Sequence, residues 1–102
     1  MEGHSVISSD VLAAYAADAA REIPGVAGLV ESPLPRHRGV RVVEGDDGIT
    51  IELHLELDWT ASAPEVGLKV QERVAAYLGE MAAVTPHRVD VVIAEVAQPP
   101  AA

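Results

Sequence analysis

The feature that most constrains the fold is a strict alternation of apolar and polar residues from Ile49 to Trp59. Every odd-numbered position in this stretch is apolar, and every even-numbered position is polar or charged. Successive side chains of a β-strand point to opposite faces, so the pattern predicts a strand with one buried and one hydrated face. Strands of this kind are typical of antiparallel sheets that are covered on one side only.

Helical periodicity precedes and follows this strand. The first predicted helix covers Ser8 to Glu22, where apolar residues recur at three- and four-residue steps and Ser8 or Ser9 can cap the N-terminus. The second begins at Ser62 and ends at about Ala82, and Ser62 and Glu65 have the spacing of a capping box. The predicted inward-facing stripe of the second helix is Val66, Val70, Val74, Leu78 and Met81.

Three further segments have strand character. Val26 to Ser32 and Gly39 to Glu44 precede the long strand, and the second of them is joined to it by a Gly-Asp-Asp-Gly turn, which is a hairpin signal. Arg88 to Val96 is apolar at both parities, which predicts a central strand or one partly covered on its second face. The predicted fold is α+β, a two-layer sandwich with a mainly antiparallel sheet of three to four strands and two helices on one face, in the order α-β-β-β-α-β.

The length of 102 residues suits one domain, which we expect to cover residues 6–96, with flexible termini at 1–5 and 97–102. Seven basic residues against sixteen acidic ones give a net charge of −9. Because affinity for nucleic acids and anionic lipids comes from clustered Lys and Arg, neither is expected as a direct partner. The chain has no cysteine, no apolar run of the roughly 18 to 20 residues that span a bilayer and no basic, then apolar leader, so we expect a cytoplasmic protein.

The polar face of the long strand is one candidate site. Glu52, His54, Glu56 and Asp58 form a row in which His54 is about 7 Å from each neighbouring carboxylate along the strand. Such a row could bind a divalent cation or another small ligand, and the alternative is an ordinary hydrated sheet face, which offers no concavity. No recognised metal-ligand spacing is present, so no metal or cofactor is expected.

A second candidate is the basic segment that contains Arg36, His37, Arg38 and Arg41. In an otherwise acidic chain it could bind a carboxylate, a phosphate or the acidic surface of a second copy, and the alternative is an exposed loop whose charges serve solubility. Catalysis has no support, because the sequence contains no Gly-x-Ser-x-Gly nucleophile elbow, P-loop or dinucleotide-binding motif.

The three aromatic residues, Tyr15, Trp59 and Tyr77, are expected in the core. Trp59 has the inward parity of the long strand, and both tyrosines lie on or beside the apolar faces of the helices. Any of them that is exposed instead becomes the first candidate for an interface anchor.

The ordered set of motifs between about Val6 and Val96 resembles the alkaline shock protein and Gls general-stress family of small bacterial cytoplasmic proteins. Two positions depart from that family's pattern: Trp59-Thr60 stands where a Tyr-Gly pair is expected, and Ala82-Ala83-Val84 stands where Thr-Gly-Leu is expected. The segments that carry the resemblance are Ile7-Ser8-Ser9-Asp10-Val11, Glu22-Ile23-Pro24-Gly25-Val26, Arg38-Gly39-Val40-Arg41-Val42, Gly48 to Trp59, Pro64-Glu65-Val66, Gln71-Glu72-Arg73-Val74 and Val89-Asp90-Val91-Val92-Ile93.

The resemblance implies a non-enzymatic protein of the envelope stress response that self-associates and is held at the inner face of the membrane by a membrane-anchored partner. It supplies no catalytic motif. For this chain, it leads to the hypothesis that copies associate through sheet edges or helix faces, and an exposed edge strand such as Gly39 to Glu44 can pair with another copy. In that hypothesis, basic residues of one copy meet acidic residues of its neighbour, and the residues involved are Arg36, Arg38, Arg41, Glu52, His54 and Glu56.

Overall fold

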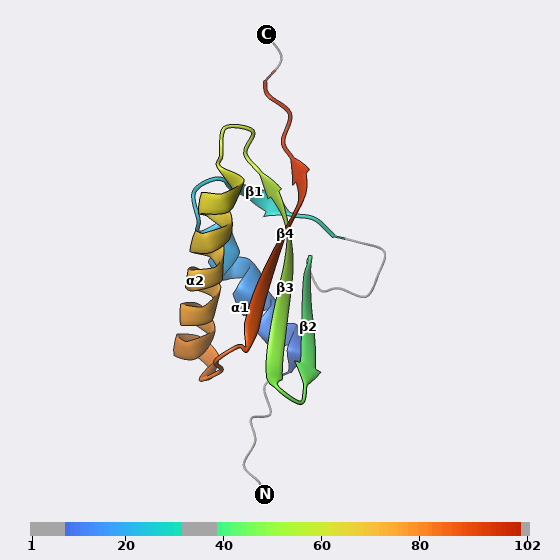
Figure 1. Ribbon diagram of the computed structural model, residues 1–102, viewed down its shortest axis with the longest axis vertical. Coiled ribbons are helices and arrows are strands. Elements are labelled where there is room, and N and C mark those ends of the chain that lie inside the picture. The colour runs from blue at the N-terminus through green and yellow to red at the C-terminus, as the bar shows by residue number, and fades with distance from the viewer. Residues whose placement is uncertain (1–7, 32–38, 101–102) are drawn as a thin grey trace, which may run out of the picture.

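A computed structural model describes residues 8–31 and 39–100 of the protein. It shows two helices and a four-stranded sheet (Figure 1). The order α-β-β-β-α-β and the α+β class agree with the sequence prediction. The elements are α1 (Ser9–Arg21), β1 (Val26–Leu29), β2 (Val40–Gly45), β3 (Gly48–Leu57), α2 (Ala63–Ala82) and β4 (Arg88–Val96).

The long alternating strand, β3, is the centre of the sheet and pairs with each of the other three strands. Its pairings with β1 and β2 are antiparallel, and its pairing with β4 is parallel. The backbone N–H of His54 donates to Gly39, and its carbonyl accepts from Val30. Because both groups of one strand residue point to the same side, β1 and β2 lie end to end along one edge of β3, and β4 lies along the other.

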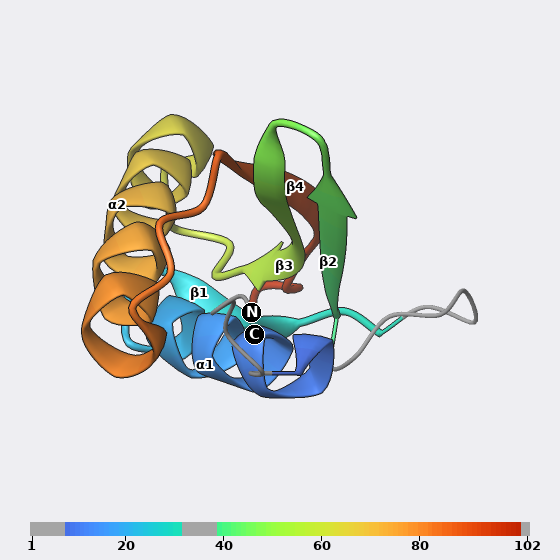
Figure 2. The same ribbon diagram turned by 90° about the horizontal axis from the view of Figure 1, so that it is seen from below.

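The core lies between the sheet and the helices, which cover one face of it (Figure 2). Alternate residues of β3 are fully buried, because their side chains all point toward the helices. Helix α1 meets the sheet with a run of buried alanines, whose small side chains let its backbone approach closely. The buried stripe of α2 is Val66, Val70, Val74, Leu78 and Ala82.

Polar and aromatic contacts join the two helices at the surface. The rings of Tyr15 and Tyr77 meet edge to face, with 5.9 Å between their centroids. The guanidinium of Arg73 lies 5.0 Å from the Tyr77 ring centroid, and its Nε donates to Glu22 at 3.0 Å. These contacts fix the lateral position of α1 against α2, and both tyrosines are half buried against the core.

The helix ends follow the sequence only in part. Ser8 is the N-cap of α1 as predicted, and its hydroxyl accepts the N–H of Val11. Ser62 is the N-cap of α2, but its side chain makes no capping bond, so the predicted capping box does not form. The C-cap of α2 is Ala83, whose φ of +55° places an L-residue in the left-handed region.

Several local expectations were wrong. Trp59 is 51% exposed, because β3 ends at Leu57 and a turn begins at the next residue, so the alternation no longer determines which side chains are buried. Met81 is 48% exposed, because it lies one position before the buried row of α2, which continues at Ala82. Strand β1 is shorter than predicted. Of the two alternatives for β4, the central position does not hold, since β3 is its only partner among the described strands.

Candidate interaction surface of the sheet

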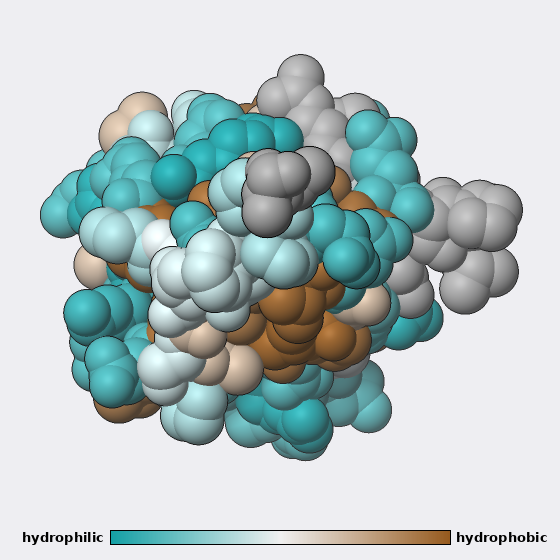
Figure 3. Space-filling model, turned by 90° about the horizontal axis from the view of Figure 1, so that it is seen from above, coloured by the Kyte–Doolittle hydropathy of each residue, from teal (hydrophilic) through white to brown (hydrophobic). Residues whose placement is uncertain are grey.

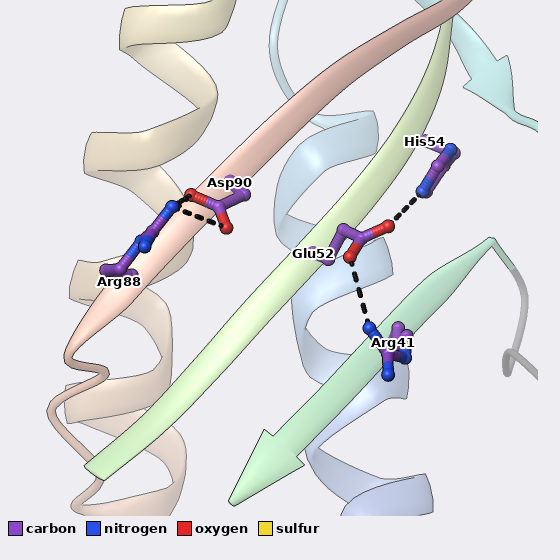
Figure 4. A network of polar contacts seen from close by, with 5 residues as sticks. All are labelled: Arg41, Glu52, His54, Arg88 and Asp90. Carbon is purple, nitrogen blue, oxygen red and sulfur yellow. Dashed lines mark hydrogen bonds and ion pairs between the residues drawn. The ribbon is translucent and has the colours of Figure 1, made fainter. Parts of the chain in front are cut away.

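The hydrated face of the sheet carries a linked group of three side chains (Figure 4). Arg41 on β2 and Glu52 on β3 are opposite each other in the register, and their Nη1 and Oε1 atoms are 3.5 Å apart. The second carboxylate oxygen of Glu52 lies 2.5 Å from His54 Nε2, two residues along the same face. The side chains of Glu52 and His54 are 23% and 13% exposed, so the group is partly shielded from water. The structure therefore brings three of the predicted site residues together.

This geometry gives Arg41 a partner within its own chain. The sequence hypothesis pairs Arg41 with an acidic residue of a neighbouring copy, and within one chain Arg41 also pairs with Glu52. Arg36 and Arg38, the other two arginines of the basic segment, and His37 lie outside the described residues. The side chain of Arg41 is still 54% exposed.

A second ion pair lies on the neighbouring strand β4. Arg88 donates to both carboxylate oxygens of Asp90 through Nη2, at 3.0 and 3.1 Å (Figure 4). All four arginines in the described part of the chain are paired with acidic residues of the same chain, since Arg21 meets Asp18 and Arg73 meets Glu22.

The other two members of the predicted row do not join the group. Glu56 is opposite Glu95 of β4 in the register, directly after a register shift between Leu55 and Glu56, so two acidic residues are neighbours across the sheet. Asp58 follows the end of β3, and its carboxylate accepts the backbone N–H and the hydroxyl of Thr60, each at 3.0 Å. These two hydrogen bonds, the backbone one first, hold the pKa of Asp58 below its usual value of 3.8.

The row does not form a metal-ligand set. Among residues 8–31 and 39–100, no three His, Asp or Glu side chains are grouped so that they could hold a metal ion. Glu52 and His54 instead satisfy each other, and Asp58 serves the turn that leads into α2. The arrangement provides a charged, partly ordered surface rather than a coordination site.

The sequence did not single out the exposed apolar residues at the end of the sheet where β3 and β4 finish. Val96, the last residue of β4, is opposite Leu57 in the register and is 55% exposed, and Trp59 lies two residues beyond Leu57. Figure 3 looks onto this end of the molecule and shows an apolar area bordered by hydrophilic residues. Trp59 is one of the three aromatic residues that the sequence predicts as interface anchors if they are exposed, and Val96 is not among them. The exposure of Val96 could not be predicted from the sequence, because Val96 has the parity of the buried face and its burial depends on where the helices end.

None of the helices in the described part of the chain has the length and apolar character needed to cross a membrane.

Comparison with known proteins places these features in a family context. A family model described as the alkaline shock protein 23 family, with a cell envelope-related function, matches residues 1–98. The chain is similar to the uncharacterised protein YqhY of Bacillus subtilis (strain 168), at 30% identity over 99 residues, which cover 87% of this chain and 73% of the relative.

Among solved structures, a histidine-to-alanine variant of MamM-CTD matches with a TM-score of 0.58 and 16% identity, covering 89% of this chain and 100% of that one. An aspartate-to-glutamate variant of the same domain, in its cadmium form, matches with a TM-score of 0.55 and 15% identity, covering 91% and 100% of the two chains. At such identity the likeness extends to the fold alone.

Proposed function

Because the chain belongs to the alkaline shock protein 23 family, a family with a cell envelope-related function, we propose that it is a non-enzymatic protein acting through self-association and protein contacts. It works in the cytoplasm in response to envelope stress, and a membrane-anchored partner recruits it to the inner face of the membrane. The interaction residues in this proposal are those of the basic segment and of the hydrated sheet face.

The observation that carries the proposal is the pair of sheet edges that have no partner strand within the described residues. Strands β2 and β4 each pair with β3 alone. An edge strand presents a row of unpaired N–H and C=O groups, which another chain can extend by strand addition. Self-association by this route needs no reactive group.

Backbone alternation identifies which groups of these edges are available. Gly39 faces β3, so Val42 and Glu44 direct their N–H groups away from it. On β4, the carbonyl of Val89 accepts from Gln71 of α2, which covers the start of that edge. The corresponding outward groups of Val91 and Ile93 follow at two-residue steps along β4.

Electrostatics supports contacts between copies as well. Each chain carries a net charge of −9, so two copies repel each other at low salt unless opposite charges pair locally at their interface. The exposed guanidinium of Arg41, together with Arg36 and Arg38, supplies the positive side, and Glu56 of a neighbouring copy supplies a carboxylate. Such surface pairs weaken as salt rises.

The proposal is tested by measuring the molar mass with light scattering after size exclusion, across protein concentration and at low and high salt. We expect a mass that rises above the 10.7 kDa of one chain with concentration and falls when salt is added. A triple variant, Arg36→Ala, Arg38→Ala and Arg41→Ala, should lower the mass at low salt. A matched variant, Arg73→Ala, removes an arginine of the helix layer and should leave it unchanged. A mass of one chain under all conditions would contradict the proposal.

A further inference from the structure

Helices α1 and α2 lie side by side, run in opposite directions and share an apolar surface (Figure 1). At its centre the rings of Tyr15 and Tyr77 meet edge to face. Val11 precedes Tyr15 by four residues and Met81 follows Tyr77 by four, so each lies on the same face of its helix as the tyrosine. Because helical side chains lean toward the N-terminus, Tyr15 leans toward Val11, and Met81 leans toward Tyr77. Val11 is 40% and Met81 48% exposed, and the four side chains form one surface, the helix-pair surface.

The centre of the helix-pair surface is held in place by its neighbours. Both tyrosine rings pack against the core, and the guanidinium of Arg73 lies over the Tyr77 ring. Arg73 is in turn fixed by its ion pair with Glu22 of α1. Tyrosine and arginine are common among the residues that dominate binding energies at protein interfaces. Because these side chains are already ordered, little conformational entropy is lost when a partner covers them.

The end of α2 beside Met81 has uncompensated negative charge. The last turn of the helix contains Glu80 and no basic residue, and the C-terminal end of a helix carries partial negative charge of its own. Glu80 has no ion-pair partner in the described part of the chain, where every arginine is paired with another acidic residue. Lys69, the only lysine, lies about 18 Å from Met81 along α2. A compensating cation must therefore come from another molecule.

We propose that the helix-pair surface binds an amphipathic helix of a partner protein, with Lys or Arg beside its apolar face. The inference rests on the proposed function and specifies the chemistry of the partner. Apolar side chains four residues apart on both helices match a third helix whose apolar residues recur at three- and four-residue steps. Its basic residues would lie against Glu80 and the C-terminus of α2. A second copy is a poorer occupant, since it brings a net charge of −9 to a surface that needs a cation.

The test titrates the full chain with a synthetic peptide of Lys and Leu, about 18 residues long, in which Leu recurs at three- and four-residue steps. Salt at about 0.1 M screens charges that are more than about 10 Å apart. NMR spectra should show saturable shifts for the backbone amides of the four residues of the helix-pair surface, with smaller shifts in β3. A peptide of the same composition in which Leu and Lys alternate has no apolar helix face and should bind more weakly. Equally tight binding of the alternating peptide would overturn the inference.

Matched variants separate this surface from general attraction of a basic peptide. Met81→Ser should raise the Kd, measured by calorimetry, about three- to tenfold, the effect of losing about half of the apolar burial of a methionine. Leu68→Ser removes a similarly exposed apolar side chain from a different face of α2 and should leave the Kd within about twofold. Glu80→Gln should raise the Kd about two- to fivefold, and Glu72→Gln, about two turns earlier, should leave it within about 1.5-fold. Equal effects within either pair would overturn the inference.

Other occupants of the helix-pair surface give different results. Shifts of the same amides when the protein alone is concentrated would assign the surface to a second copy, and shifts with anionic vesicles but not with the peptide would assign it to lipid. Either result overturns the inference. Met81→Ser should keep the concentration-dependent mass of the wild type, because Met81 lies on α2 and not on a sheet edge. Failure of peptide binding with the mass dependence intact therefore overturns this inference alone, and a wild-type mass of one chain at every concentration overturns the proposed self-association.

Discussion

Replacing Ala83 by glycine should stabilise the protein. Ala83 is the C-cap of α2 with a φ of +55°, and its N–H donates to the carbonyl of Leu78. The left-handed conformation costs an L-residue about 1–2 kcal/mol, and glycine adopts it freely. Glycine also loses more conformational freedom on folding than alanine does, which lowers the free energy of unfolding by about 0.5–1 kcal/mol. The net gain should be about 0.5–1 kcal/mol, or roughly 2–8 °C in Tm for a domain of this size.

Thermal unfolding followed by circular dichroism and urea unfolding followed by tryptophan fluorescence measure this gain. Gly79→Ala is the matched control, because Gly79 lies inside α2 with open space where a Cβ would be, so alanine should add about 1 kcal/mol. Gly25→Ala should have the opposite sign, since Gly25 has a φ of +100° and a Cβ there would lie 2.8 Å from Val66 Cγ2. A Tm of Ala83→Gly at or below the wild-type value, with Gly79→Ala stabilising, would refute the reasoning.

Three further outcomes are expected. Leu53→Ala, at a fully buried position of β3, should cost about 2–5 kcal/mol in urea unfolding, and a cost below about 1 kcal/mol would show that the sheet face is not the core. The hydrogen bonds from Thr60 lower the pKa of Asp58 in the folded state, so they stabilise the fold at pH values above the usual pKa of 3.8. This stabilisation is lost as the pH falls through the lowered pKa, and Asp58→Asn should therefore make the free energy of unfolding less dependent on pH in the acid range. Arg73→Met should cost about 0.5–1 kcal/mol, and a double-mutant cycle with Glu22→Gln should show coupling between the two residues.

The architecture could be predicted from the sequence wherever one period persists over a whole element. The alternation of β3 predicted the strand and its buried face, because the strand lies on a core that covers one side of the sheet. In the same way, apolar residues at four-residue spacing from Val66 to Leu78 predicted most of the buried stripe of α2. The prediction failed at element ends, as at Trp59 and Met81, where burial depends on the exact residue at which a neighbouring element stops.

The candidate site was less accessible from the sequence. The row from Glu52 to Asp58 was visible as a pattern, but the pairing of Glu52 with Arg41 depends on the register of β2 against β3. The closeness of Glu56 and Glu95 likewise depends on the parallel pairing of β4, which is distant in the sequence. Parallel pairing of β4 was not predicted, since a strand that follows a helix gives no local signal of its direction.

The central claim is that the free edges of the sheet bind other chains. Hydrogen exchange of individual backbone amides, compared between dilute and concentrated protein at low salt, tests it most directly. The outward amides are those of Val42 and Glu44 on β2 and of Val91 and Ile93 on β4. We expect exchange at one of these edges to slow as the concentration rises. Identical exchange at every concentration, with the amides facing β3 protected throughout, would contradict the claim.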